Sequence, residues 1–173
     1  MYFVGIDPGA DGAVVIISET NLLYAQRISQ DDDHCSKICK IFRLYSPTEL
    51  VVAIEDLRAI YGVRSDSTFA LGWACGFWNG VCDAYGLQLH PVKPKEWQAA
   101  MVQSPRRPAV PKGLHITERR KIMYRHKQAI KAASVDAARA IYPEANIIHD
   151  GVADAVCIAN WLKHKYKNEV TFT

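Results

Sequence analysis

The sequence has no long hydrophobic run. Its longest mostly apolar stretch, Phe69 to Cys82, has 14 residues and includes Asn79. A membrane-spanning helix needs about 20 consecutive apolar residues, so this stretch is too short to cross a bilayer. The sequence therefore predicts a protein without a transmembrane segment and without a membrane partner.

Cysteine is also scarce, and its five copies are an odd number that cannot pair completely into disulfides. The first apolar run, Tyr2 to Ile6, has only five residues and no basic segment before it, which is not the pattern of a secretory signal. We therefore expect a reduced, intracellular and cytoplasmic chain. His34, Cys35 and Cys39 have no second pair at zinc spacing, which favours ordinary thiols over a zinc site.

A large charge of one sign is lacking as well, since the formal net charge is only +3. This small value hides an uneven distribution. Residues 104–131 carry nine basic side chains against one acidic one, a charge of +8, which leaves −5 for the remainder. One basic segment on an acidic body is typical of nucleic-acid binding, although a solvated helix or loop gives the same pattern. The basic residues are Arg106, Arg107, Lys112, Arg119, Arg120, Lys121, Arg125, Lys127 and Lys131.

The stretch Tyr2 to Ile17 is the one around which the chain is organised. An apolar run ends at Asp7, where a Pro-Gly pair stops the strand, and the following Asp-Gly pair is a hairpin signal before a second apolar run. An aspartate at the end of such a strand has no packing role. It is either a turn residue or a metal-binding carboxylate on a rigid element, and partner carboxylates elsewhere favour the metal.

Residue patterns along the rest of the chain predict a mixed α/β fold without linkers or repeats. We expect one domain over residues 1–173, with a basic insertion at about 104–125. The expected elements after the first hairpin are a strand at Leu22–Ile28, a helix at His34–Leu44, a strand at Leu50–Ile54, a helix at Asp66–Tyr85, a strand at Leu87–Val92, a short helix at Pro94–Met101, a basic helix from Thr117 to about Tyr142 with a break near Tyr124, and a last helix from Asp150.

The expected helix at Asp66–Tyr85 carries Gly72, Gly76 and Gly80 on one stripe. Glycine weakens a helix, so three copies at a spacing of four need a structural reason. We expect close approach of another helix or of the sheet, with a contact between two copies of the chain as a special case.

A second candidate carboxylate follows the expected strand at Leu50–Ile54. The strand is continuously apolar, as in strands buried on both faces, and it ends in Glu55 and Asp56. Successive side chains of a strand point to opposite faces, so only one of these acids can share a face with Asp7. We expect Glu55 to be that residue; a simple charge pair at a strand end is the alternative.

Asp150 and Asp154 lie four residues apart at the start of the last expected helix, on one face and one turn apart. Like charges placed in this way repel each other, and a bound cation would remove the conflict. Asp150 could instead cap the helix. Together with Asp7 and Glu55, the two acids would form a group of four carboxylates at one edge of the sheet, typical of a two-metal phosphodiesterase site.

Several motifs, taken in order, resemble the RuvC-like Holliday junction resolvases. They are GIDPG with the following DGA, AIED, PVKPKEWQ after the glycine-rich segment, KAAS with a later YP, and HDGVADAVCIANW. The similarity covers nearly the whole chain except Ser104 to Arg125, and it looks closest to the phage-type branch and the related organellar resolvases. A phage-encoded protein would act in the cytoplasm of a bacterial host.

The resemblance implies a ribonuclease H-like fold, with a mixed five-stranded sheet flanked by helices. It also implies a homodimer that nicks four-way DNA junctions symmetrically, with Mg²⁺ or Mn²⁺ and without a nucleotide cofactor. The catalytic carboxylates map onto Asp7, Glu55, Asp150 and Asp154. In bacterial RuvC the last two acids are three residues apart, whereas here they are four apart and Gly151 stands at the expected place.

The resemblance also suggests DNA contacts outside the acids. Lys131, with Lys127 as the alternative, is the candidate for a contact to the scissile phosphate. Arg58 and Tyr61 are candidates for a side chain inserted at the junction centre. Two metal ions would hydrolyse the strand in line and leave a 5′ phosphate and a 3′ hydroxyl.

Three other interpretations remain open at this point. The hairpin resembles that of actin-like ATPases and sugar kinases, but those proteins need two such domains and a second phosphate loop. A flap or branched-DNA nuclease without junction selectivity would have the same acids. A DNA-binding scaffold with a silent site is the alternative from a different class. We expect the basic insertion to strengthen DNA binding in general rather than to recognise junction shape.

Overall fold

The structure is a computed structural model that describes residues 1–9, 11–28, 34–57 and 65–170. In chain order its elements are β1 (Tyr2–Asp7), β2 (Ala13–Ile17), β3 (Leu22–Arg27), α1 (His34–Phe42), a short 3-10 helix (Pro47–Glu49), β4 (Leu50–Glu55), α2 (Ser65–Ala84), β5 (Leu89–Val92), α3 (Pro94–Met101), α4 (Ile116–Ile141) and α5 (Asp150–Val170). In the part of the chain that the structure describes, no helix is both long and apolar enough to span a membrane.

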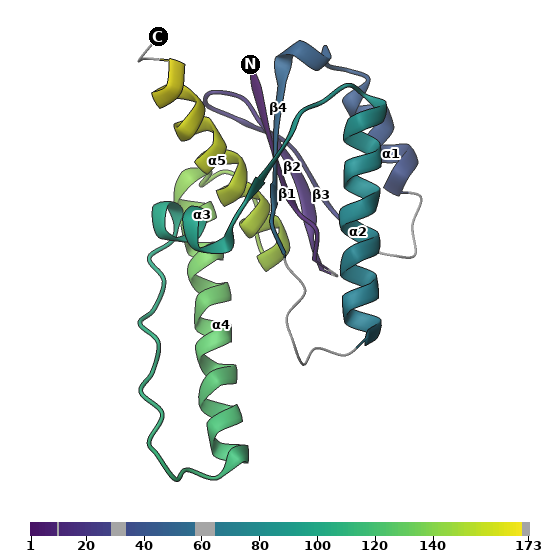
Figure 1. The fold of residues 1–173 in the computed structure, drawn as a ribbon. Helices are drawn as coiled ribbons and strands as arrows, with labels where there is room; N and C mark the ends of the chain where they lie inside the picture. Colours follow the sequence, from purple (N-terminus) through teal and green to yellow (C-terminus); the bar gives the residue numbers. More distant parts are fainter. Residues whose placement is uncertain (10, 29–33, 58–64, 171–173) are drawn as a thin grey trace.

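The centre of the molecule is a five-stranded mixed sheet in the order β3-β2-β1-β4-β5, as Figure 1 shows. The first three strands form an antiparallel meander, and β4 and β5 join it in parallel. Helices α1 and α2 cover one face, and α3, α4 and α5 lie on the other. This architecture confirms the predicted α/β fold with a mixed five-stranded sheet flanked by helices.

Alternation along the two central strands decides which side chains reach which face. Val4 and Ile6 of β1 belong to the core beneath α1 and α2, whereas Phe3 belongs to the core beneath α5. In β4, Val52 and Ile54 likewise pack toward α1 and α2, and Ala53 packs toward α5. The last residues of β1 and β4 therefore both belong to the α5 face, because side chains two positions apart share a face.

Helix α5 packs unusually close to β1, because the strand has a glycine at the crossing point. A Cβ atom at Gly5 would lie 2.1 Å from the carbonyl oxygen of Ala155 and 2.6 Å from the backbone nitrogen of Ala159. Any side chain at this position would push the helix away from the sheet. The small residue thus sets the height of α5 above the end of β1.

Helix α4 is 26 residues long and runs without the break that the sequence suggested near Tyr124. Its C-terminal half packs beside α5, where Ser134 and Ala138 are buried. Its N-terminal half extends away from the sheet, and the chain between α3 and α4 runs alongside it (Figure 1). We call this projection, formed by the loop 102–115 and residues 116–130 of α4, the arm.

No described element of the chain approaches the glycine stripe on α2, so the expected contact within the chain is wrong, and the contact between two copies stays a prediction. Among the residues that the structure describes, a Cβ atom at Gly72, Gly76 or Gly80 would meet no atom within 4 Å. Beside this open stripe, Phe69 is 75% exposed and Trp73 is 54% exposed. The only large aromatic residue of α2 that the structure buries completely, within the described residues, is Trp78.

Candidate active site

Two carboxylates stand side by side at the carboxyl ends of the parallel central strands. Ile6 of β1 is in register with Ile54 of β4, so Asp7 and Glu55 occupy corresponding positions at the ends of these strands. Both follow the α5-facing alternation of their strands. The structure thus places Glu55 on the same face as Asp7, and it places Asp56 on the opposite face.

Glu55 is fixed by a buried indole. Trp97, which is fully buried on α3, donates a hydrogen bond from Nε1 to Oε1 of Glu55 over 3.0 Å. Burial raises the pKa of Glu55 to about 7, the negative charge of Asp7 adds to this rise, and the Trp97 bond opposes it. The carboxylate is therefore aimed by a rigid donor while its charge is poorly solvated.

Asp7 is held in a similar way by the backbone of the following turn. The N–H group of Gly9 donates to Oδ1 of Asp7 over 2.9 Å. Burial raises the pKa of Asp7 to about 6, the Gly9 bond lowers it, and the charge of Asp150 raises it. The Pro-Gly turn after β1 therefore orients the carboxylate as well as ending the strand.

Asp154 comes from the first turns of α5 and faces the two strand ends. Burial raises its pKa to about 7, a hydrogen bond from Ser134 lowers it, and the charges of Asp7 and Asp150 raise it. Its Oδ1 atom is buried and has no hydrogen-bond partner among the described residues. A buried carboxylate oxygen without a partner is costly, which indicates an oxygen that is meant for a ligand.

Asp150 differs from the other three acids because it already has a cationic partner. Nζ of Lys131 in α4 donates to Oδ2 of Asp150, at the first residue of α5. Partial burial opposes ionisation of Asp150, but the hydrogen bond and charge of Lys131 outweigh this and lower its pKa. The same bond raises the pKa of Lys131, so the pair is charged at neutral pH.

Gly151 explains why the last two acids are four residues apart. A Cβ atom at this position would lie 2.0 Å from the carbonyl oxygen of Asp11, in the turn between β1 and β2. An aspartate cannot occupy this position without moving the hairpin away from α5. The N-terminal acid of the helix therefore has to stand at residue 150, one position earlier than the resemblance predicts.

The four acids fit divalent metal ions by their chemistry. The donor set is entirely carboxylate oxygen, which Mg²⁺ prefers. Burial, and after it mutual repulsion, raises the pKa values of Asp7, Glu55 and Asp154. Bound cations would relieve that repulsion and use the unpartnered oxygen of Asp154. In the described ranges, no three acidic, histidine or cysteine side chains are already arranged around a common metal position. Side chains, Lys131 among them, would adjust on binding.

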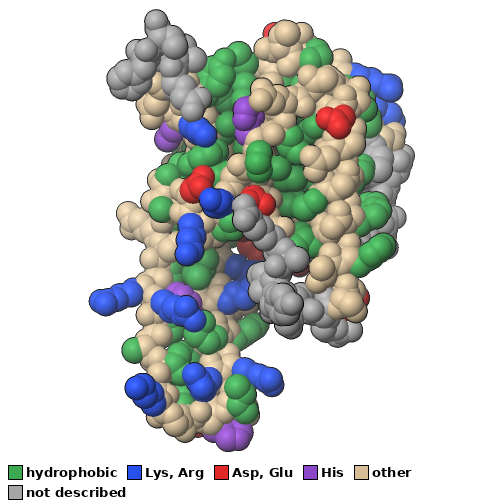
Figure 2. Space-filling model, in the orientation of Figure 1, with side chains coloured by type: hydrophobic (Ala, Val, Ile, Leu, Met, Phe, Trp, Pro, Cys, Tyr) green, Lys and Arg blue, Asp and Glu red, His purple; other side chains and the backbone are tan. Residues whose placement is uncertain are grey.

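The predicted DNA contacts divide into three groups. Arg58 and Tyr61 lie outside the described residues. Lys131 lies at the acids, whereas Lys127 stands one helical turn further along α4, exposed and without a contact to the four acids. The remaining basic residues lie on the arm, over which Figure 2 shows lysine and arginine side chains spread.

Two functional neighbours were not assigned a role from the sequence. Trp97 was visible only as part of the PVKPKEWQ motif, and Ser134 only as part of KAAS. Their partners, Glu55 and Asp154, lie 42 and 20 residues away along the chain. The one available signal was a tryptophan in a short expected helix, because an indole N–H requires an acceptor when the ring is buried.

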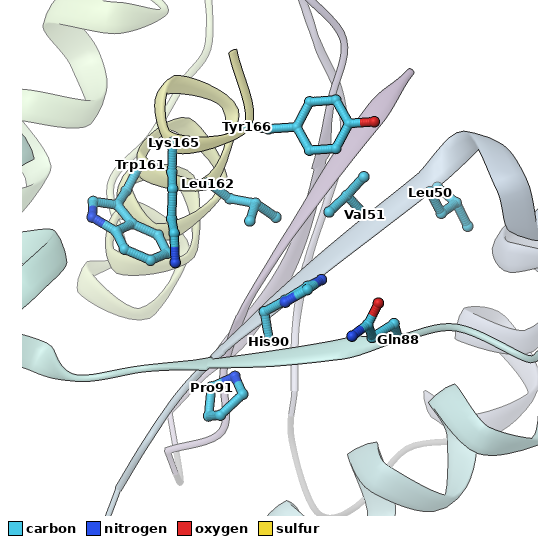
Figure 3. Close-up of a pocket in the computed structure, with 9 residues that line it drawn as sticks. All are labelled: Leu50, Val51, Gln88, His90, Pro91, Trp161, Leu162, Lys165 and Tyr166. Atoms are coloured by element: carbon cyan, nitrogen blue, oxygen red, sulfur yellow. The ribbon is translucent and has the colours of Figure 1, made fainter. Parts of the chain in front are cut away.

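A cavity of about 320 Å³ lies away from the acids, at the start of β4. In Figure 3 its walls come from β4, β5 and the C-terminal half of α5, with Lys165 alongside the Trp161 ring. The Lys165 ammonium stands 5.3 Å from the centre of that ring. None of the described residues that line the cavity is acidic, so it is separate from the carboxylate site.

Comparison with solved structures identifies the fold. No family model and no curated protein sequence matches this chain. The structure "T. thermophilus RuvC in complex with Holliday junction substrate" matches with a TM-score of 0.65 and 14% identity over 97% of this chain and 96% of that one. "Thermus thermophilus RuvC structure" matches with a TM-score of 0.61 and 17% identity over 98% and 97%. The chain thus has the fold of RuvC over almost its full length.

Proposed function

We propose that this protein is a metal-dependent endonuclease that resolves four-way DNA junctions. The observation that carries the proposal is the convergence of Asp7, Glu55, Asp150 and Asp154 at one edge of a sheet, in the fold of a Holliday junction resolvase. Three of these acids are desolvated and repel one another, which a structural role would not require.

The side chains have distinct tasks in this proposal. Asp7, Glu55 and Asp154 would hold the cations on rigid elements, and Asp150 would complete the set. Two Mg²⁺ or Mn²⁺ ions would supply a nucleophilic water and Lewis-acid stabilisation of the reacting phosphate. Trp97 and the Gly9 N–H keep two of the carboxylates oriented throughout. Hydrolysis in line would leave a 5′ phosphate and a 3′ hydroxyl.

Lys131 is proposed to contact the scissile phosphate. Its ammonium stands at the acids, and its side chain is 38% exposed, so it can reach a strand that passes the site. A phosphate oxygen would replace Asp150 as its acceptor once cations take over that carboxylate. Arg58 and Tyr61 stay candidates for contacts at the junction centre, and the basic arm is proposed to bind the flanking DNA.

We further propose that the protein acts as a homodimer through α2. The face of α2 with Gly72, Gly76 and Gly80 is open, and exposed Phe69 and Trp73 lie beside it. Trp73 stacks on Phe77 at 5.8 Å between ring centres, which gives the face a flat apolar surface. A second copy would cover this surface, and two sites related by symmetry would cut opposed strands.

The test is cleavage of an end-labelled mobile four-way junction beside a linear duplex and a 5′ flap, each with Mg²⁺, Mn²⁺ or EDTA. The expected result is paired symmetric nicks in the junction with either metal, and none in EDTA. Asp7→Asn should abolish nicking and keep junction binding. Equal cutting of flaps and junctions would replace the proposal with a general branch nuclease.

Tight junction binding without cutting under any metal would instead favour a scaffold with a silent site. Ligation of the products distinguishes the predicted chemistry from other strand cleavage. A 5′ phosphate beside a 3′ hydroxyl is joined by DNA ligase, whereas a 3′ phosphate is not. Failure of ligation would overturn the proposed direction of hydrolysis even if the junction were cut.

A further inference from the structure

One face of α4 runs from the acids to the end of the arm. Residues on this face follow one another at intervals of four and three, so they form a single row along the helix. In order from the arm to the body, the row consists of Arg120, Tyr124, Lys127, Lys131, Ser134 and Ala138.

The upper part of this row is covered by α5. Ser134 and Ala138 are buried there, and Lys131 contacts Asp150, the first residue of α5. Since α5 begins at Asp150, it does not extend beyond Lys131 to cover the lower part of the row. Lys127 and Arg120 are exposed, and the Tyr124 side chain is 64% exposed.

The loop of the arm runs alongside α4 (Figure 1). Ile122 and His126 are partly buried, and they lie on the side of the helix away from Lys127 and Arg120. The row is thus open along the arm, with a cation, an aromatic ring and a second cation before it reaches Lys131. Alternating cations and an aromatic ring suit a nucleic-acid strand with a charged backbone and stackable bases.

The geometry points to this row as a track for one DNA strand that leads into the carboxylate site. Lys127 and Arg120 contact successive parts of the backbone, and Tyr124 stacks on a base between them. This inference rests on the proposed nuclease function and deepens it, because it specifies which face of the arm carries the scissile strand. The other basic residues of the arm contribute only their general positive field.

Helix geometry predicts the spacing of these contacts. At about 1.5 Å per residue, Lys127, Tyr124 and Arg120 lie about 6, 10 and 16 Å from Lys131 along the helix axis. A stacked strand advances about 3.4 Å per nucleotide. The three residues should therefore meet the strand about two, three and five nucleotides from the scissile phosphate.

The first test compares salt dependence for variants on opposite faces of the same helix. Lys127→Ala and Arg120→Ala are matched with Arg119→Ala and Arg125→Ala, which remove the same charge from other faces of the arm. Junction affinity is measured in EDTA by fluorescence anisotropy at several salt concentrations. Each variant on the row should lower the slope of log affinity against log salt by about 0.9, or about eightfold in affinity at 0.1 M salt. The matched variants should lower both the affinity and the slope by distinctly less, because a charge that acts only through the general field is screened by salt.

Tyr124 is tested by two substitutions. Tyr124→Phe keeps the ring and should bind like the wild type, whereas Tyr124→Ala should weaken binding about tenfold through lost stacking. All these side chains are exposed, and circular dichroism checks that each variant is folded. Equal losses for phenylalanine and alanine would overturn the stacking role.

Crosslinking tests the order of the contacts. The photoreactive amino acid p-benzoylphenylalanine replaces Arg120, Tyr124 or Lys127 in turn, with Arg125 as the matched position, in protein bound to the junction in EDTA. Crosslinks should fall on the strand that the wild type nicks in Mg²⁺, at distances that increase from Lys127 to Arg120, and Arg125 should give none on that strand. Equal salt slopes on both faces, or crosslinks without this order, would overturn the track. Failure of the wild type to nick the junction would count against the proposed function, since binding and crosslinking do not depend on cleavage.

Discussion

Replacing Asp154 with asparagine should stabilise the metal-free protein while it destroys the site. Burial and two neighbouring carboxylates raise the pKa of Asp154 from its ordinary value of 3.8 to about 7. At pH 8 the Asp154 carboxylate is therefore ionised, and its charge is less stable in the folded protein than in the unfolded chain. Asparagine has nearly the same shape, can still accept the hydrogen bond from Ser134, and carries no charge.

The size of the effect follows from the pKa. Raising a carboxyl pKa from 3.8 to about 7 corresponds to roughly 4 kcal/mol of lost folding free energy once the group is ionised in both states. The folded pKa lies above the unfolded one, so this cost is absent below the unfolded pKa and grows as pH rises to the folded pKa. Between pH 5 and pH 8 the advantage of Asp154→Asn should increase by roughly 2 to 3 kcal/mol.

The assay is thermal unfolding followed by circular dichroism in EDTA at pH 5, 6, 7 and 8. The variant should unfold at a temperature higher than the wild type at pH 8, by about 10 °C, with a smaller difference at pH 5. Asp136→Asn is the matched control, because it removes an exposed carboxylate from α4. Adding Mg²⁺ should raise the unfolding temperature of the wild type and leave that of Asp154→Asn unchanged.

Two results would refute this reasoning. If Asp154→Asn were less stable than the wild type at pH 8, the buried charge would not be the cost that the geometry indicates. If the stability difference did not change between pH 5 and pH 8, the carboxyl group would not titrate in that range. The control should show neither effect, so a shift in Asp136→Asn of the same size would point to general charge repulsion instead.

Three further outcomes are expected. Trp97→Phe removes the hydrogen bond that lowers the pKa of Glu55. The acidic limb of the pH profile for Mg²⁺-dependent nicking should therefore move to higher pH. An acidic limb at the same pH as in the wild type would contradict the orienting role of Trp97. Lys131→Gln breaks a partly exposed ion pair, so it should lower the free energy of unfolding in denaturant by less than about 1 kcal/mol. The same change should slow junction nicking at least about a hundredfold if the ammonium contacts the scissile phosphate. Trp73→Glu places a charge on the open face of α2, so light scattering should show a monomer, whereas Lys95→Glu on α3 should leave the mass unchanged.

The strands of the sheet were accessible from the sequence because they carry distinct patterns, whereas their order was not predicted. A continuous apolar run predicted the buried parallel strand β4, and the hairpin signal predicted the antiparallel start. The parallel pairing of β1 with β4 was the condition for Asp7 and Glu55 to be neighbours, and the structure shows that pairing. The strand bounds differ by at most two residues, at β5, which begins at Leu89 rather than Leu87.

Close backbone approaches could not be read from the pattern. The stripe Gly72, Gly76 and Gly80 looked like a packing surface within the chain, whereas the glycines that admit a neighbour are isolated ones, Gly5 and Gly151. A lone glycine in a strand or a helix gives no indication of which segment will cross it. The ion pair of Lys131 with Asp150 was hidden for the same reason, because it depends on where α4 crosses α5.

The same two glycines show how the fold creates the electrostatic conflict at its site. Gly5 lets α5 settle onto β1, which carries Asp154 toward the strand ends, and Gly151 lets the start of α5 meet the β1–β2 turn beside Asp7. The close packing that removes water from these carboxylates is therefore also what brings them together. This close packing holds Asp7, Glu55 and Asp154 in place and raises their pKa values. Asp150 is instead partly exposed, and Lys131 neutralises its charge. A cation entering the site would thus meet three buried acids that lack a cationic partner of their own, and it would have to compete with Lys131 for Asp150.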